Sequence, residues 1–241
     1  MKSNAAYGYP SAPLLIALVG ADGAGKSTVA KHLVRWLGQF GPAEQVHLGK
    51  QAGNMGRALA GAPVIGGLVG RFLRKKSDGV KGRIKAHRQP TLVPALIITA
   101  FSLRRLRRFR RMLSMRRRGT AIVTDRFPQI GTPNAFDGPG FPFDAQGSWV
   151  VTQLARFEHA AFQRMVRHTP DLVVRLHVSL DVAVARKPDH RREALARKIA
   201  ILPGLAFGLA KVVEIDADAP LPDVLAAVER AAGELMMSRA V

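Results

Sequence analysis

One nine-residue segment near the N-terminus constrains this chain more than any other feature. Residues 20–28 read Gly-Ala-Asp-Gly-Ala-Gly-Lys-Ser-Thr; they follow the apolar run 14–19 and precede an amphipathic stretch. Glycines at these positions let backbone N–H groups turn inward on phosphate oxygens, and the start of the following helix adds its positive dipole end. The segment therefore matches the P-loop pattern in the context that the pattern requires, and it predicts a nucleotide phosphate site.

The P-loop pattern assigns roles to single residues. Lys26 is expected to reach the β- and γ-phosphates of ATP, and Ser27 to ligate Mg²⁺, so the predicted cofactors are ATP and Mg²⁺. Asp22 either contacts an acceptor hydroxyl or is a loop residue that bonds to its own backbone. The residues predicted to surround the nucleotide are Gly20, Asp22, Gly23, Ala24, Gly25, Lys26, Ser27 and Thr28.

The rest of the chain alternates between strand-like and helix-like patterns. Apolar runs predict five strands, at residues 14–19, 46–48, 121–124, 172–178 and 212–215. Segments in which apolar residues recur at helical spacing separate these strands, and another such segment follows the fifth strand. Strands that alternate with helices favour a parallel sheet covered on both faces. We therefore predict an α/β fold of the P-loop NTPase class, with a five-stranded parallel sheet sandwiched by helices.

One domain is predicted, with a tail and an insertion. Residues 1–13 are small and polar, and we expect a flexible N-terminal tail, while residues 14–241 form a single P-loop domain. Glycine and proline breaks interrupt the helical pattern of residues 50–118, where we expect a basic helical insertion. Residues 95–118 contain neither glycine nor proline and predict one long helix.

The charge of the chain is concentrated in that insertion. The net charge is +20; residues 50–118 hold 19 basic residues and one acidic residue, whereas the other 172 residues hold 18 and 16. Such a sector indicates an anionic partner or a solvated helix face. The apolar stretches 58–73 and 92–103 of this sector each adjoin a basic cluster. This layout is typical of a helix that lies on an anionic lipid surface. The alternative is that both stretches are buried in the core of the domain. Nucleic acid ranks lower because few aromatic residues interleave with the arginines.

Cysteine is absent, which excludes disulfides, thiolate metal sites and a cysteine nucleophile. The longest charge-free stretches are shorter than the roughly 20 apolar residues that a membrane-spanning helix needs. We therefore expect a cytoplasmic protein, with the inner membrane face as the place of any peripheral contact. A homodimer is compatible with the sequence.

The chain resembles thymidylate kinases at several separate places. Its P-loop has the acidic third residue of that family, and Asp125-Arg126-Phe127 resembles their Asp-Arg-aromatic signature. Arg104 and Gly119 stand 21 and six residues before Asp125, at about the offsets of an arginine and a glycine in that family. Further similar segments are residues 132–136, 178–187, 215–217 and 221–224. The resemblance implies the same fold and phosphoryl transfer from ATP to a small phosphorylated acceptor.

The resemblance also implies roles for side chains beyond the P-loop. Asp125, at the end of a strand, would hold Mg²⁺ through water, or it is a loop carboxylate. Arg126 would grip the acceptor phosphate, unless it forms an ordinary salt bridge. Arg104 would contact the acceptor as well. The predicted catalytic residues are Lys26, Asp125, Arg126 and Arg186, with Asp22, Arg104 and Arg126 on the acceptor and Ser27 and Asp125 on the metal.

A lid is expected at about residues 186–198, where Arg186, together with Arg191 and Arg192, would close over the phosphates. A solvated helix face is the competing interpretation. This segment is similar to that of thymidylate kinase-like proteins associated with bacterial surface-polysaccharide loci, whose substrates need not be nucleotides.

One departure bears on the acceptor. Thymidylate kinases carry an Arg-Glu-Pro-Gly segment after the second strand, whereas residues 47–53 here read His-Leu-Gly-Lys-Gln-Ala-Gly. We predict a thymidylate kinase-like nucleoside monophosphate kinase. The alternatives are a kinase for a non-nucleotide acceptor in surface-polysaccharide or lipid metabolism, and an ATP-binding regulator docked on membrane or nucleic acid.

Overall fold

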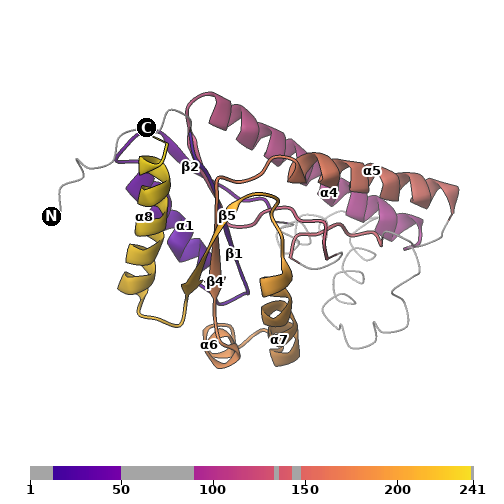
Figure 1. Ribbon diagram of the computed structural model, residues 1–241. Coiled ribbons are helices and arrows are strands. Elements are labelled where there is room, and N and C mark those ends of the chain that lie inside the picture. Colours follow the sequence, from indigo (N-terminus) through magenta and orange to yellow (C-terminus); the bar gives the residue numbers. More distant parts are fainter. Residues whose placement is uncertain (1–12, 50–89, 133–135, 143–147, 240–241) are drawn as a thin grey trace, which may run out of the picture.

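The computed structural model describes residues 13–49, 90–132, 136–142 and 148–239 (Figure 1). The predicted N-terminal tail, except for Pro13, and residues 50–89 of the predicted insertion lie outside the described residues. Residues 133–135 of the segment that resembles an acceptor stretch lie outside them as well.

The described residues form one parallel sheet of five strands. The strands are β1 (Leu15–Gly20), β2 (Ala43–Val46), β3 (Ala121–Thr124), β4 (Leu172–His177) and β5 (Lys211–Asp216). They pair in the order β2-β3-β1-β4-β5, and every pairing is parallel. The predicted α/β fold with a five-stranded parallel sheet is confirmed. Since the chain leaves β1 for one edge of the sheet and later adds β4 and β5 on the other side, the carboxyl end of β1 is a topological switch point, where α/β sheets bind ligands.

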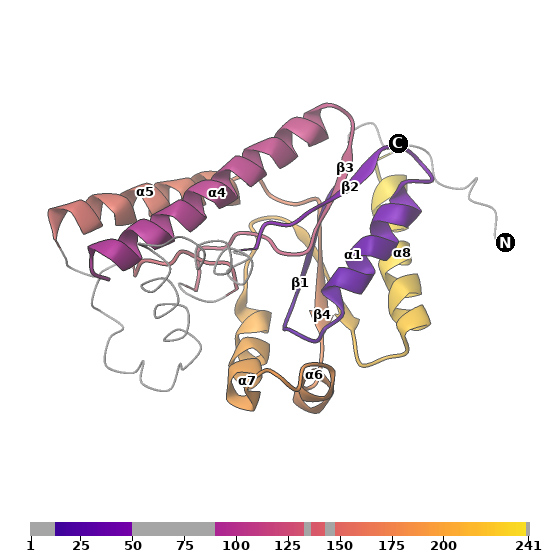
Figure 2. The same cartoon turned by 180° about the vertical axis from the view of Figure 1, so that it is seen from behind.

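Helices cover both faces of this sheet (Figures 1 and 2). On one face lie α1 (Lys26–Leu37) and α8 (Leu221–Met237), which pack on Ile16 and Leu18 of β1. On the other face lie α4 (Leu92–Arg117) and α5 (Trp149–Val166), which pack on Leu15 and Ala17. Alternate residues of β1 thus serve opposite cores, as expected for a central strand. The remaining helices are α6 (Leu180–Arg186), α7 (Arg192–Ile201) and the short η3 (Leu202–Gly204).

Two elements differ from the sequence prediction by more than one residue at a boundary. The strand predicted at 46–48 is β2 at Ala43–Val46, because an edge strand that pairs only with β3 tolerates the polar residues Glu44 and Gln45. The long helix predicted from residue 95 begins at Leu92 instead. Pro94 lies in its first turn, where the missing N–H would have no helical partner in any case.

The paired helices α4 and α5 project well beyond the sheet (Figures 1 and 2). A separate small core of Ala95, Phe141, Val151 and Ala155 holds their projecting ends together. Within the described ranges, we find no helix with the length and apolar character required to cross a membrane.

Candidate active site

The P-loop is built as an anion cradle between β1 and α1. Gly23 and Gly25 have φ angles of 91° and 80°, in the left-handed region that favours glycine. A Cβ on Gly23 would also lie 3.1 Å from the backbone of Ala183 in α6. Helix α1 starts at Lys26 with no acidic residue in its first turn and no side-chain cap at Gly25. The positive end of α1 is therefore open to an anionic ligand.

A cavity of about 390 Å³ lies above this cradle and gathers most of the predicted site residues. Besides residues of the P-loop it is lined by Asp125 and Arg126, which follow β3, by Arg186 at the end of α6, and by His47 and His190. The P-loop residues that line it are Asp22, Gly23, Gly25, Lys26, Ser27 and Thr28. The sheet thus brings together residues more than 150 positions apart in the sequence.

Lys26 is held at the floor of the cradle. Its Nζ donates to the carbonyl oxygens of Gly20 at 2.9 Å and Ala21 at 2.7 Å. Burial, followed by the positive charge of Arg126, lowers the pKa of Lys26 to about 8. An anionic ligand in the cavity would stabilise the charged ammonium form of Lys26.

The two carboxylate oxygens of Asp125 differ in their partners. His47 Nδ1 contacts Asp125 Oδ2, because Val46 pairs with Thr124 and the next residues of β2 and β3 emerge side by side. Asp125 Oδ1 is buried and has no hydrogen-bond partner among the described residues. A buried carboxylate oxygen without a partner is costly unless a ligand or water completes it. With Ser27 on the same cavity, this oxygen fits the few protein ligands that a Mg²⁺ ion bound to a nucleotide uses.

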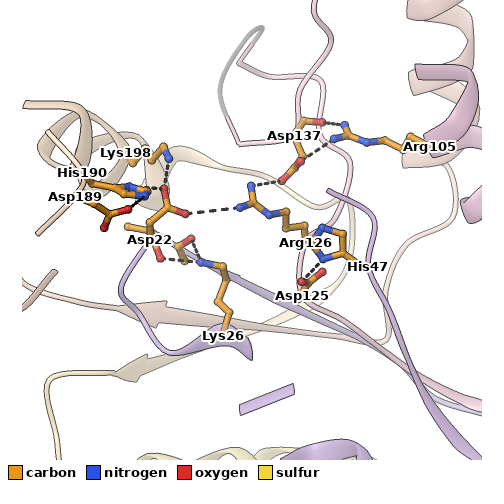
Figure 3. A network of polar contacts seen from close by, with 12 residues as sticks. Asp22, Lys26, His47, Arg105, Asp125, Arg126, Asp137, Asp189, His190 and Lys198 are labelled. Atoms are coloured by element: carbon orange, nitrogen blue, oxygen red, sulfur yellow. Dashed lines mark hydrogen bonds and ion pairs between the residues drawn. The ribbon is translucent and has the colours of Figure 1, made fainter. Parts of the chain in front are cut away.

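Arg126 lies between two carboxylates (Figure 3). Its guanidinium is 3.6 Å from Asp22 and 3.4 Å from Asp137. Burial opposes the charge of Arg126, but Asp137, Asp22 and Asp125 outweigh it and raise the pKa of this arginine. Arg126 is therefore always charged and is pointed at the cavity by its neighbours.

Asp137 is itself anchored by a buried arginine of α4. Arg105 donates to the Asp137 carbonyl at 2.5 Å and to its carboxylate at 2.7 Å, and both side chains are at least 93% buried. The guanidinium of Arg105 also lies 5.4 Å from the ring centre of Phe162. Two successive ion pairs thus link Arg105 of α4 to Arg126 through Asp137.

The predicted lid contacts the P-loop at Asp22. Lys198 of α7 forms an ion pair with Asp22, and His190 lies 3.6 Å from the same carboxylate. Burial raises the pKa of Asp22, but the hydrogen bond and charge of Lys198 and the charges of Lys26 and Arg126 lower it overall. Asp22 is therefore ionised and links the P-loop to α7.

The lid arginines divide into one at the cavity and two at the surface. Arg186 lines the cavity and donates to the carbonyls of Gly23 at 3.2 Å and Ala217 at 2.9 Å. Arg192 is exposed and pairs with Asp181 at 2.7 Å, and Arg191 lies 3.9 Å from Glu193.

One predicted acceptor residue lies elsewhere. Arg104 is exposed on α4 and is not among the described residues that line the cavity. Its neighbour Arg105 is the arginine that reaches the site. The signal was present in the sequence: Arg105 shares a helix face with Ser102, Phe109 and Met112, all buried, whereas Arg104 does not.

Two comparisons place the chain among known proteins. Over 222 residues it is 38% identical to the protein called uncharacterized ATP-binding protein YghS of Escherichia coli (strain K12), covering 90% of this chain and 91% of that protein. Over 220 residues it is 34% identical to uncharacterized ATP-binding protein YghR of the same strain, covering 91% and 86%. The chain belongs to the family of YghS and YghR. No protein-family model matches it.

A solved structure of deoxyadenosine kinase from M. mycoides with bound dATP is also similar to this member of the YghS and YghR family. The two chains are 12% identical with a TM-score of 0.48, over 90% of this chain and 97% of that chain.

The site of this YghS and YghR family member combines three chemical features around one cavity. These are a phosphate cradle with Lys26, a carboxylate oxygen of Asp125 that has no hydrogen-bond partner among the described residues, and a cation, Arg126, held by its neighbours. Such a site can hold a polyphosphate with a divalent cation and orient a second anionic group against it.

Proposed function

We propose that the protein is an ATP- and Mg²⁺-dependent phosphotransferase that acts on a small phosphorylated acceptor. The observation that carries the proposal is one cavity lined by the P-loop, by Asp125, whose Oδ1 has no hydrogen-bond partner among the described residues, and by Arg126. The names of both relatives, which are called ATP-binding proteins, support the nucleotide.

In this proposal the P-loop side holds the donor. Backbone N–H groups of residues 23–28 and the Lys26 ammonium bind the β- and γ-phosphates, and Ser27 and Asp125 hold Mg²⁺. The ion, when bound, neutralises charge on the transferring phosphoryl group. Lys26 and Arg186 surround the nucleotide with positive charge in a partly buried site, where such charges act more strongly than in water.

The acceptor lies on the Arg126 side. Arg126 orients the acceptor phosphate, one of whose oxygens forms the new bond to the γ-phosphorus while the bond to the β,γ-bridging oxygen breaks and ADP leaves. An acceptor phosphate oxygen is already deprotonated at neutral pH, so this reaction needs no general base. Asp22, Asp137 and Arg105 keep the guanidinium in place.

The most specific form of the proposal is a thymidylate kinase-like nucleoside monophosphate kinase. The second candidate is a kinase for a sugar phosphate or lipid phosphate. The observation that favours the second is His47, which directly follows β2 and is turned onto Asp125, whereas thymidylate kinases carry an arginine-bearing acceptor segment after this strand.

Acceptor-dependent release of ADP tests the proposal. The purified protein with ATP and Mg²⁺ is given a panel of nucleoside monophosphates and sugar phosphates, with Lys26→Ala as the control. We expect ADP release to rise with one class of acceptor and to fall at least about 100-fold in the control, because Lys26 stabilises the phosphates in the transition state. Release that is independent of every acceptor would contradict a kinase and point to a regulator.

A further inference from the structure

One face of α4 is exposed along its whole length and changes character halfway. Its exposed residues recur every three or four positions, which places them on one side of the helix. They are Leu92, Val93, Leu96 and Ala100 in the first half and Arg104, Arg107, Arg110, Arg111 and Arg117 in the second, continued by Arg118 at the helix end. We call the exposed arginines the arginine stripe. No acidic residue occurs in α4.

The apolar half of this face belongs to a larger exposed patch. Leu92 and Leu96 are 48% and 51% exposed, and Trp149 at the start of α5 is 75% exposed. Together with Val93 and Val150 these residues form what we call the apolar tip. These residues lie at the N-terminal ends of α4 and α5. The two ends lie together, where the helix pair projects farthest from the sheet (Figures 1 and 2).

The arginines of α4 differ in whether a carboxylate of the described residues pairs with them. Arg105 and Arg116, which turn inward, have the carboxylate partners Asp137 and Asp171. Among the residues described by the structure, no carboxylate forms an ion pair with Arg107, Arg110 or Arg117. The apolar tip and the arginine stripe together extend along about 39 Å of helix. A contiguous exposed apolar patch of this kind is uncommon on a protein surface that contacts only water.

We propose that the apolar tip and the arginine stripe dock the protein on an anionic phospholipid surface. The arginines would lie on the headgroups, while Trp149 and the leucines enter the boundary between headgroups and acyl chains, where tryptophan is enriched. A second copy of the chain on this face would bring arginine stripes against each other, and a nucleic acid would leave the apolar tip uncovered. The membrane surface is the partner that uses both halves.

Tryptophan fluorescence tests the apolar tip directly. The chain has two tryptophans, of which Trp36 is buried in the core and Trp149 is exposed. In a Trp36→Phe background the emission therefore reports on Trp149 alone. We expect vesicles of phosphatidylcholine with phosphatidylglycerol to shift the emission to shorter wavelength, and brominated acyl chains to quench it. Unchanged emission from vesicle-bound protein would overturn the proposal.

Vesicle flotation tests the arginine stripe. The triple variant Arg107→Gln, Arg110→Gln, Arg118→Gln is compared with Lys31→Gln, Arg35→Gln, Arg230→Gln, which removes the same charge from exposed positions on α1 and α8. Since each basic residue near an anionic surface contributes about fivefold, the stripe variant should bind such vesicles about 100-fold more weakly. The control should bind like the wild type, although residues 50–89 carry further basic side chains in both proteins.

Three results would overturn the proposal. The first is equal loss of vesicle binding in both triple variants, with folding of each confirmed by circular dichroism. The second is equally strong binding to vesicles of phosphatidylcholine alone. The third is a homodimer that Leu96→Ser and Trp149→Ser dissociate without weakening vesicle binding, because the apolar tip would then be an interface between copies. None of these results bears on ADP release, so the proposal and the proposed function fail separately.

Discussion

At the scale of single residues, Lys26 links the electrostatics of the cradle to nucleotide binding. Its pKa is about 8, lowered by burial and then by Arg126. Phosphate groups favour the ammonium form, so the pKa must be higher in the nucleotide complex than in the free protein. The affinity for ATP is therefore complete below pH 8 and declines as the pH rises through 8, by at most tenfold per pH unit.

Isothermal titration of ATP with Mg²⁺ between pH 6.5 and 9.5 would measure this decline. Lys26→Met serves as the control, which should bind more weakly and with little pH dependence above pH 7. A wild-type affinity that stays constant up to pH 9.5 would show that the ammonium does not meet the phosphates.

Asp137 is a second residue on which the site depends. Breaking a buried ion pair costs about 3–5 kcal/mol, because the remaining charge stays buried without its partner. Asp137→Asn would leave the buried guanidinium of Arg105 without its carboxylate partner. We therefore expect the free energy of unfolding, measured by urea denaturation, to fall by about 3–5 kcal/mol. The double variant Arg105→Met, Asp137→Asn should be less destabilised than the sum of its single variants, since no unpaired guanidinium remains. Additive losses would show that the two side chains do not interact.

The site residues that could be predicted from the sequence are those that belong to a local sequence motif. The P-loop residues and Asp125 occupy the cavity because their positions follow from the ends of β1 and β3. His47 could have been found from the parallel register, since it follows β2 where Asp125 follows β3. Asp137 could not, because it stands in an irregular loop at a positive φ of 64°, where Arg105 of a distant helix holds it beside Arg126.

At the scale of elements, α4 and α5 hold the loop that carries Asp137. Glu158 of α5 is fully buried, accepts from the N–H groups of Gly140 and Phe141 at 2.8 Å each, and contacts the Ser102 hydroxyl of α4. This carboxylate fastens the loop after Asp137 to both helices.

Glu158→Ala would leave those three donors without their partner. Each buried donor left unpaired costs about 1–3 kcal/mol, so we expect a loss of at least about 2 kcal/mol in urea denaturation. Glu234→Ala on α8, which removes an exposed ion pair with Lys211, should change stability by less than about 1 kcal/mol. Equal effects of the two changes would contradict a fastening role for Glu158.

The elements themselves were largely readable from periodicity. The buried strands β1, β3 and β4 stand out as apolar runs, and α1 and α5 as amphipathic helices. The edge strand β2 was misplaced by three residues because its middle residues are polar and exposed. The projection of α4 and α5 beyond the sheet was not predicted, since sequence spacing gives the length of a helix but not what lies under it.

At the scale of the whole molecule, a nearly neutral scaffold carries a strongly basic sector, the described part of which lies on α4. The cavity at the P-loop lies at the carboxyl ends of the strands, and the arginine stripe runs along a helix that packs on one face of the same sheet. The two features are separate in their residues. We therefore expect the stripe variant to retain the affinity of the wild type for ATP in titration calorimetry. A loss in that variant would show that the stripe belongs to the nucleotide site.

Transfer of the γ-phosphoryl group tests the central claim most directly. The protein is incubated with Mg²⁺, ATP labelled in the γ-phosphate and the acceptor panel, and the products are separated. The account predicts label in a new phosphorylated product with one acceptor class, and none in Lys26→Ala. Label that appears only as inorganic phosphate, at a rate that no acceptor changes, would contradict phosphoryl transfer and leave an ATP-hydrolysing regulator.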